Sequence, residues 1–115
     1  MASFIAKRRH PRYLLSTRLT AAPYPEDQHI GTHSRALDIS ESGVGGVFQE
    51  SWDVGTCLRL EVSLPVEQTP LKVGAIVRHH TGVRYGFEFI DMSIEQRRIL
   101  RNACEVLSKA VDGSG

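Results

Sequence analysis

The chain has few cysteines and no long apolar run, and each shortage narrows the classes of protein to which it can belong. Its two cysteines, Cys57 and Cys104, are far apart and have no neighbour at metal-ligand spacing, so we expect reduced, apolar side chains rather than a disulfide. No segment approaches the ~20 apolar residues of a membrane span, and residues 1–7 hold no apolar signal-peptide core. We therefore expect a cytoplasmic domain without membrane insertion.

An excess of charge of one sign is also missing. The 14 Lys and Arg residues nearly balance the 13 Asp and Glu residues, which leaves a net charge of +1 and no general attraction to a polyanion. A small barrel that binds single-stranded nucleic acid would need exposed aromatic residues interleaved with basic ones. In residues 83–89, Val83, Tyr85, Phe87 and Phe89 form one apolar row, so the three aromatic residues fall on the expected core face of a strand. We expect no DNA or RNA partner.

Signatures of catalysis are absent from the sequence. It contains no glycine-rich phosphate loop with a lysine and no convincing Ser-His-Asp order, although Ser40, Asp38 and the five histidines leave a hydrolytic arrangement open. We predict that the protein is not an enzyme and has no cofactor.

Two histidine pairs have spacings that could suit a metal ion, but the local structure expected at each pair does not bring the side chains together. His29 and His33 have the spacing of helical ligands, but Gly31 and the prolines upstream argue against a helix. His79 and His80 are adjacent at the expected end of a hairpin, where neighbouring side chains point to opposite faces. We predict no metal site.

The 115 residues suit one domain with its own core, and their hydrophobic pattern favours strands. Six short segments alternate between apolar and polar residues and are predicted to be strands: 13–21, 32–40, 44–49, 57–64, 71–79 and 83–89. Ser93 and Gln96 form a capping box, after which apolar residues recur at helical spacing. We predict a mainly β fold, a six-stranded antiparallel β-barrel with one C-terminal α-helix.

The domain boundaries follow from this pattern. Residues 1–6 are predicted to be a flexible lead, residues 7–111 a single domain, and residues 112–115, which are rich in glycine, a flexible tail.

A polar pair leads into a glycine-rich bend in residues 38–46. If residues 37–40 are extended, Asp38 and Ser40 share one face of the strand, because side chains alternate. Gly43 follows where a chain that turns with positive φ, or admits a ligand to its bare N–H, accepts glycine at least cost. The segment indicates either a recognition edge or an ordinary turn in which Asp38 and Ser40 bond their own backbone.

Every charge that precedes Glu26 is positive: Lys7, Arg8, Arg9, Arg12 and Arg18. Pro11 removes a backbone donor and pushes residue 10 toward extended geometry, so this segment is predicted to be a loop. Such an unopposed cluster suits a small anion or phosphate groups, and the alternative is a solvated basic tail.

The two features together form a motif pair. The segment R-x-x-x-R, from Arg8 to Arg12, followed by D-x-S-x-x-G at Asp38, Ser40 and Gly43, resembles the PilZ domain family. In that family the two motifs together bind the bacterial second messenger cyclic di-GMP (c-di-GMP). The resemblance implies the same six-stranded barrel with a C-terminal helix, and the same ligand.

The resemblance implies roles for the matching residues. Arg8 and Arg12 supply guanidinium groups, which bond phosphates bidentately, meet guanine O6 and N7, and stack on a base. Asp38 can accept from the guanine N1–H and N2–H₂ edge and so select guanine over adenine. Ser40 adds a hydrogen bond and Gly43 a bare N–H. Further ligand-binding candidates are Arg9, Arg35 and Gly45.

Two functions are open to such a chain. The first is a c-di-GMP receptor, favoured as a monomer, whose arginine loop becomes ordered on the nucleotide and which signals to an unidentified downstream protein. The alternative is an adaptor with the same fold that binds a protein and no nucleotide.

Overall fold

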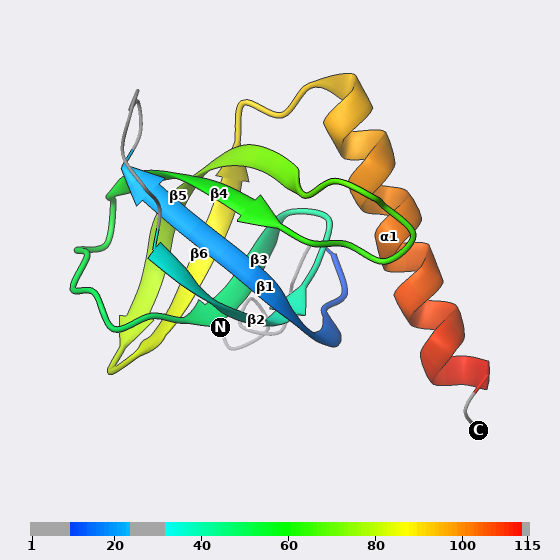
Figure 1. Ribbon diagram of the computed structural model, residues 1–115, viewed down its shortest axis with the longest axis horizontal. Helices are drawn as coiled ribbons and strands as arrows, with labels where there is room; N and C mark the ends of the chain where they lie inside the picture. The colour runs from blue at the N-terminus through cyan, green and yellow to red at the C-terminus, as the bar shows by residue number, and fades with distance from the viewer. Residues whose placement is uncertain (1–9, 24–31, 114–115) are drawn as a thin grey trace, which may run out of the picture.

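Six strands and one helix make up the fold (Figure 1). The structure is a computed structural model, and it describes residues 10–23 and 32–113. The strands are β1 (Tyr13–Pro23), β2 (Thr32–Ile39), β3 (Gly43–Val47), β4 (Cys57–Val62), β5 (Leu71–Thr81) and β6 (Arg84–Ile90), and the helix is α1 (Ile94–Gly113). Each strand overlaps one of the alternating segments, so the predicted set of strands is confirmed.

The strands close into an antiparallel barrel in the order β1-β2-β3-β6-β5-β4, with β4 pairing back to β1. Two meanders, β1 to β3 and β4 to β6, are therefore joined side by side through the β3–β6 and β1–β4 pairs. This arrangement leaves no open sheet edge, and it confirms the predicted barrel.

The barrel interior is filled by the apolar side of each strand. Alternation places Leu58, Leu60 and Val62 of β4 inside, with exposed fractions of 1% or less. In β6 the row predicted for the core is correct for Tyr85, Phe87 and Phe89. It is wrong for Val83, which is 45% exposed because it lies in the turn between β5 and β6 rather than in a strand.

An aromatic cluster closes the barrel at the β5–β6 hairpin. Phe48 packs edge-on against Trp52, Tyr85 and Phe87, with ring centroids 5.1 to 6.2 Å apart. The Tyr85 hydroxyl donates to the Glu50 carbonyl at 2.5 Å and accepts from the Trp52 N–H at 3.0 Å. These bonds tie the β3–β4 connection to the core.

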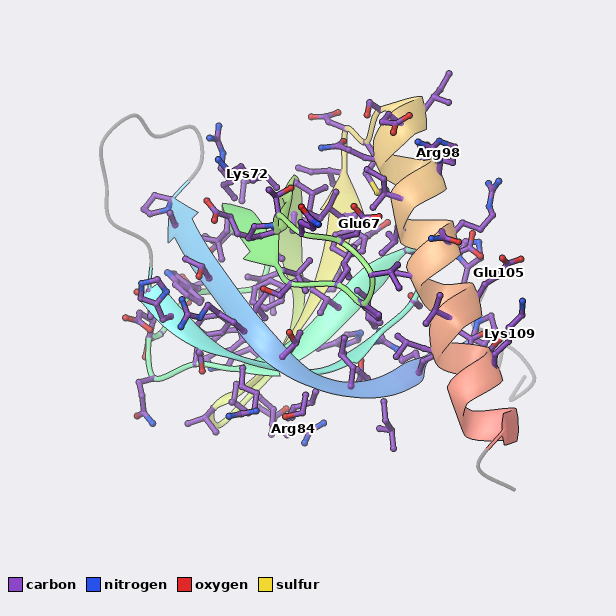
Figure 2. All side chains as sticks on the ribbon, turned by 45° about the vertical axis from the view of Figure 1, so that its right-hand side comes forward. Glu67, Lys72, Arg84, Arg98, Glu105 and Lys109 are labelled. Atoms are coloured by element: carbon purple, nitrogen blue, oxygen red, sulfur yellow. The ribbon has the colours of Figure 1, made fainter. Side chains whose placement is uncertain are left out.

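Helix α1 lies against the barrel beyond the far end of β6 (Figure 1). The predicted capping box is present, because Gln96 N–H donates to Ser93 Oγ at 3.0 Å and Ser93 N–H to Gln96 Oε1 at 2.8 Å. Leu100 and Ala103 join the core, while Arg98, Glu105 and Lys109 point to solvent (Figure 2). The helix is therefore amphipathic.

The helix ends at Gly113, two residues beyond the predicted end of the domain. Among the described residues, no helix is both long and apolar enough to cross a membrane.

Two β-bulges change which residues face outward. Leu37 is an extra residue in β2, because Ala36 pairs with Gly46 whereas Asp38 pairs with Gly45. A second bulge in β5 lies between Val77 and His79. With strict alternation, Asp38 would share the inner face with Ala36, and His79 would share it with Val77. Each bulge adds one residue in between, so it turns a polar side chain outward.

Candidate functional site

The bend after β2 is built around Ser40. Its side chain is buried, with 2% exposed, and its Oγ accepts hydrogen bonds from the N–H groups of Ser42 at 3.1 Å and Gly43 at 3.2 Å. The Ser40 N–H donates to the Gly43 carbonyl at 2.9 Å. Ser40 therefore makes the local backbone hydrogen bonds that are predicted for an ordinary turn, and its oxygen stabilises the bend from β2 to β3.

Gly43 is required for a close strand approach rather than for an unusual backbone angle. Among the described residues, the glycines with positive φ are Gly55 and Gly82, so the left-handed turn considered for Gly43 is wrong. A Cβ atom at Gly43 would lie 2.2 Å from the Phe87 carbonyl oxygen across the β3–β6 pair. Its N–H is also used by Ser40. Whether Gly43 contacts a ligand remains a prediction.

Asp38 behaves differently, because it points outward and meets the N-terminal segment. Arg12 Nη1 lies 2.5 Å from Asp38 Oδ1, and the two side chains are 28% and 19% exposed. The strand register explains the contact, since Leu14 pairs with Asp38 and Arg12 precedes Leu14 by two residues on the same outer face. The structure thus brings together one residue from each motif.

A row of outward positions runs from Asp38 across three neighbouring strands. Asp38 pairs with Gly45, Gly45 with Gly86, and Gly86 with His79. The Asp38 carboxylate lies over Gly45, where a Cβ atom would be 2.8 Å from Oδ1. Gly86 has no side chain, so backbone forms the floor between the carboxylate on one side and the imidazole of His79 on the other.

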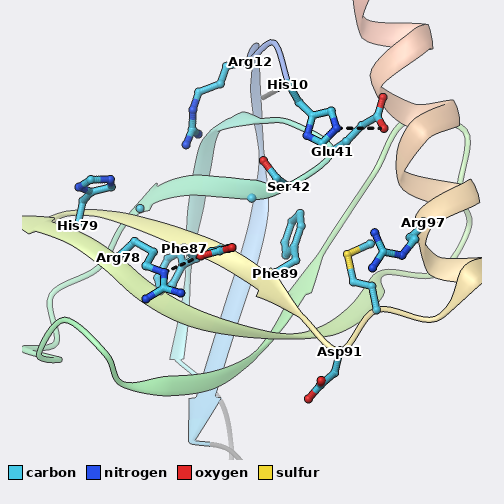
Figure 3. Close-up of a pocket in the computed structure, with 14 residues that line it drawn as sticks. His10, Arg12, Glu41, Ser42, Arg78, His79, Phe87, Phe89, Asp91 and Arg97 are labelled. Carbon is cyan, nitrogen blue, oxygen red and sulfur yellow. Dashed lines mark hydrogen bonds and ion pairs between the residues drawn. The ribbon is translucent and has the colours of Figure 1, made fainter. Parts of the chain in front are cut away.

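This row borders a cleft of about 470 Å³ (Figure 3). The cleft reaches from the Arg12 segment across β6 to the first turns of α1. A smaller hollow of about 260 Å³ continues from it, and the two share Arg12, His79 and Gly86. Asp38 and Gly45 line the smaller hollow, whereas Ser42 and Gly43 line the larger one.

Charged side chains of both signs line the cleft, and two of its acids, Glu41 and Glu88, lie close to basic side chains. Arg78 Nε donates to Glu88 Oε1 at 2.6 Å, and Figure 3 shows this pair on one wall. Glu41 Oε1 lies 3.9 Å from His10 Nε2 and 3.7 Å from Arg101 Nε. The cations therefore come from three sources, namely the N-terminal segment, β5 and α1.

The remaining sequence candidates are placed as follows. Arg35 is exposed, donates to Ser16 Oγ, and is not among the residues that line the cleft or the hollow. It pairs across strands with Arg18. Arg8 and Arg9 lie outside the described residues, so their roles remain predictions.

Metal binding and thiol chemistry find little support in the described part of the chain. No group of three His, Cys, Asp or Glu side chains lies close enough there to hold a metal ion. Cys104 is a buried residue of α1, and burial, followed by the nearby charge of Glu41, raises the pKa of its thiol to about 11. Cys104 is therefore an uncharged packing group at neutral pH.

Sequence reasoning missed the cleft residues that β5, β6 and α1 contribute. Arg78, His79, Gly86 and Arg97 line it but belong to no motif. Alternation in β6 does mark Gly86 as an outward position between buried Tyr85 and Phe87, which was an available signal. The outward turn of His79 depends on a bulge, and the approach of α1 depends on tertiary packing, so neither has a local signal.

The family model that matches is the PilZ domain, over residues 6–105. The chain belongs to the PilZ domain family. The match contains the described site and the arginine segment before it, so the resemblance predicted from the two motifs is confirmed. No curated protein matches the chain in sequence.

Solved PilZ structures share this fold. The PilZ domain of YcgR from Escherichia coli with c-di-GMP superposes with a TM-score of 0.72 at 16% identity, covering 94% of this chain and 96% of that one. YcgR in complex with c-di-GMP gives 0.76 at 17% identity, covering 94% and 49%. The Bacillus subtilis inhibitor of motility, MotI/DgrA, gives 0.74 at 17% identity, covering 92% and 52%. The chain thus spans about half of the two longer proteins.

Proposed function

We propose that this domain is a c-di-GMP receptor that binds the nucleotide in the cleft beside the Arg12–Asp38 pair and passes the bound state to a partner protein. Membership of the PilZ family supports a receptor or adaptor role rather than an enzymatic one. Two structures of similar fold contain c-di-GMP, which supports the choice of ligand.

The observation that carries the proposal is the contact between Arg12 and Asp38 across 26 residues of sequence. A guanine base presents acceptors on its O6 and N7 edge and donors at N1 and N2. A guanidinium group beside a carboxylate offers the complementary donors and acceptors at one place. Gly86 has no side chain of its own, and the exposed ring of His79 lies against it, so a flat base that binds between Asp38 and His79 would have to displace that ring.

The mechanism uses the N-terminal segment as the responsive part. Arg8, Arg9 and Arg12 belong to one short segment of like charges that repel each other, and Asp38 already offsets the charge of Arg12. A dianionic nucleotide that contacts both this segment and the outer face of the barrel would favour one arrangement of the segment. The partner protein then recognises that arrangement.

One observation favours the adaptor alternative. Arg12 and Asp38 already satisfy each other, and the Ser40 oxygen accepts two backbone hydrogen bonds, so these polar groups have partners without a ligand. An unused site would look the same, and the barrel would then serve as a protein-binding surface.

Isothermal titration calorimetry with c-di-GMP, and with cyclic di-AMP as the control nucleotide, separates these functions. The receptor hypothesis predicts saturable heat with c-di-GMP and affinity weaker by at least about tenfold for the adenine compound, because an unpaired buried edge costs more than one hydrogen bond. No saturable heat from c-di-GMP at high concentration would favour the adaptor.

A further inference from the structure

The helix end of the cleft contains a guanidinium group that neither sequence motif includes. Arg97 lies in the first turns of α1 and lines the cleft together with Arg12. Figure 3 shows its side chain pointing from the helix into the cleft, opposite the N-terminal segment. Its neighbour in sequence, Arg98, pairs with Glu95 and points to solvent in Figure 2. One residue of sequence thus separates a cleft arginine from a surface arginine.

The acids that line the cleft do not neutralise Arg97. Glu88 pairs with Arg78, and Glu41 lies within 4 Å of His10 and Arg101. Asp91 lines the cleft but points away from Arg97 in Figure 3. Among the described residues, no ion pair joins an acid to the Arg97 guanidinium. An anionic ligand group would therefore meet a cation that has not already formed an ion pair there.

The helix is also tied to the bend that follows Asp38. Arg101 lies one helical turn after Arg97, on the same side of α1, and its Nε is 3.7 Å from Glu41. Glu41 lies between Ser40 and Ser42 in the second motif. The contact between Glu41 and Arg101 shows that the bend after Asp38 lies beside α1, while the buried side chains of Leu100 and Ala103 hold the helix against the barrel.

We infer that Arg97 is a further ligand-binding residue, which contacts a phosphate group of the nucleotide from the side opposite Arg12. This inference rests on the proposed function, because it requires the cleft to hold a phosphodiester. A cyclic dinucleotide carries two phosphates on opposite sides of its ring, and the cleft offers a guanidinium group at each end. The helix α1 then becomes part of the binding site.

The test compares Arg97→Ala with its neighbour Arg98→Ala, using calorimetric titration of c-di-GMP into the whole chain. The loss of one charge-assisted contact predicts affinity weaker by about ten- to a hundredfold for R97A, and within about twofold of wild type for R98A. Arg97→Lys keeps the charge but not the bidentate fork, and should give an intermediate affinity. R97A should also show a weaker dependence of affinity on salt concentration than R98A, which a purely structural role would not produce.

The outcomes are distinguishable. If wild type binds and both alanine variants bind equally well, the role of Arg97 is wrong while the receptor function stands. If wild type shows no binding, the proposed function is wrong and the role of Arg97 falls with it. Thermal unfolding of R97A at the wild-type temperature would verify that the exposed side chain has been removed without damage to the fold.

Discussion

The guanidinium group of Arg12 and the carboxylate of Asp38 lie 2.5 Å apart, although 26 residues separate them in sequence. Both side chains are partly buried, so the pair is screened less than a surface ion pair and holds the N-terminal segment against β2. This contact brings one residue of each motif to the same place on the barrel surface. A nucleotide bound as we propose would either contact this pair or replace one of its members, and would thereby change the contacts of Arg12.

Asp38 should determine which base is accepted. With Asp38→Ala, we expect the preference for c-di-GMP over cyclic di-AMP to fall at least about tenfold, because the acceptor for the guanine N1–H and N2–H₂ edge is lost. Titration of both nucleotides measures the ratio, and Glu105→Ala on the outer face of α1 is the matched control. An unchanged ratio in D38A would assign base selection to another residue.

The absence of a side chain at Gly86 should affect nucleotide affinity and leave the stability of the fold unchanged. In Gly86→Ala the new methyl group would lie 3.2 Å from Cδ2 of His79, an exposed side chain that lines the cleft. We expect nucleotide affinity to fall by about fivefold or more, since a methyl group would occupy the space of a flat base.

The control for this variant is Gly74→Ala in β5. Its methyl group meets Ile90 Cγ1 at a similar 3.3 Å, but Gly74 lines neither the cleft nor the smaller hollow. The two variants should have similar unfolding temperatures and different affinities. Equal nucleotide affinities of the two variants would show that the surface at Gly86 is not part of the binding site.

Ser40 should act mainly through the fold. Ser40→Ala leaves the N–H groups of Ser42 and Gly43 without their acceptor, in a bend where Ser40 and Gly43 are buried. We expect the free energy of unfolding to fall by about 1–3 kcal/mol, measured by urea denaturation. Ser42→Ala keeps both backbone donors and their acceptor, and should cost much less. If S40A binds nucleotide poorly at full stability, Ser40 is a direct ligand contact instead.

Cys104 should make stability depend on pH in the alkaline range. Its folded pKa, raised to about 11 by burial and by Glu41, exceeds the ordinary value of 9.0. The folded state therefore keeps a proton that the unfolded state releases. The resulting stabilisation is complete below about pH 9 and is lost as the pH rises to about 11.

Denaturation across this range should show a steeper loss of stability for wild type than for Cys104→Ala. In Cys57→Ala, the remaining thiol should react with a thiol reagent at pH 8 only after unfolding. Rapid labelling of the folded C57A protein would contradict the burial of Cys104.

Local patterns predicted the strands well because inward positions such as Leu58 and Leu60 alternate strictly with polar ones. Local patterns failed to predict which face a side chain occupies where a β-bulge interrupts the alternation. The bulges at Leu37 and before His79 have no residue-type signal, yet they decide that Asp38 and His79 face the same outer row. Closure of the barrel through β1 and β4 is equally nonlocal.

The same limit applies to the site. Arg12 and Asp38 could be predicted because each belongs to a recognisable motif, and motifs summarise contacts that are distant in sequence. Arg78 and Arg97 belong to none, and their place at the cleft follows from the packing of β5 and α1. The left-handed turn predicted as one reason for Gly43 is wrong, and the structure requires glycine there because of its close approach to the Phe87 carbonyl oxygen.

The central claim is that Arg12 and Asp38 hold c-di-GMP together, and calorimetric titration of wild type, Arg12→Ala and Asp38→Ala with that nucleotide tests it most directly. Circular dichroism should show the same fold for all three proteins. We predict saturable binding by wild type and affinity at least about tenfold weaker in each variant, since each loses a charge-assisted contact. Wild-type affinity in Arg12→Ala would contradict the claim.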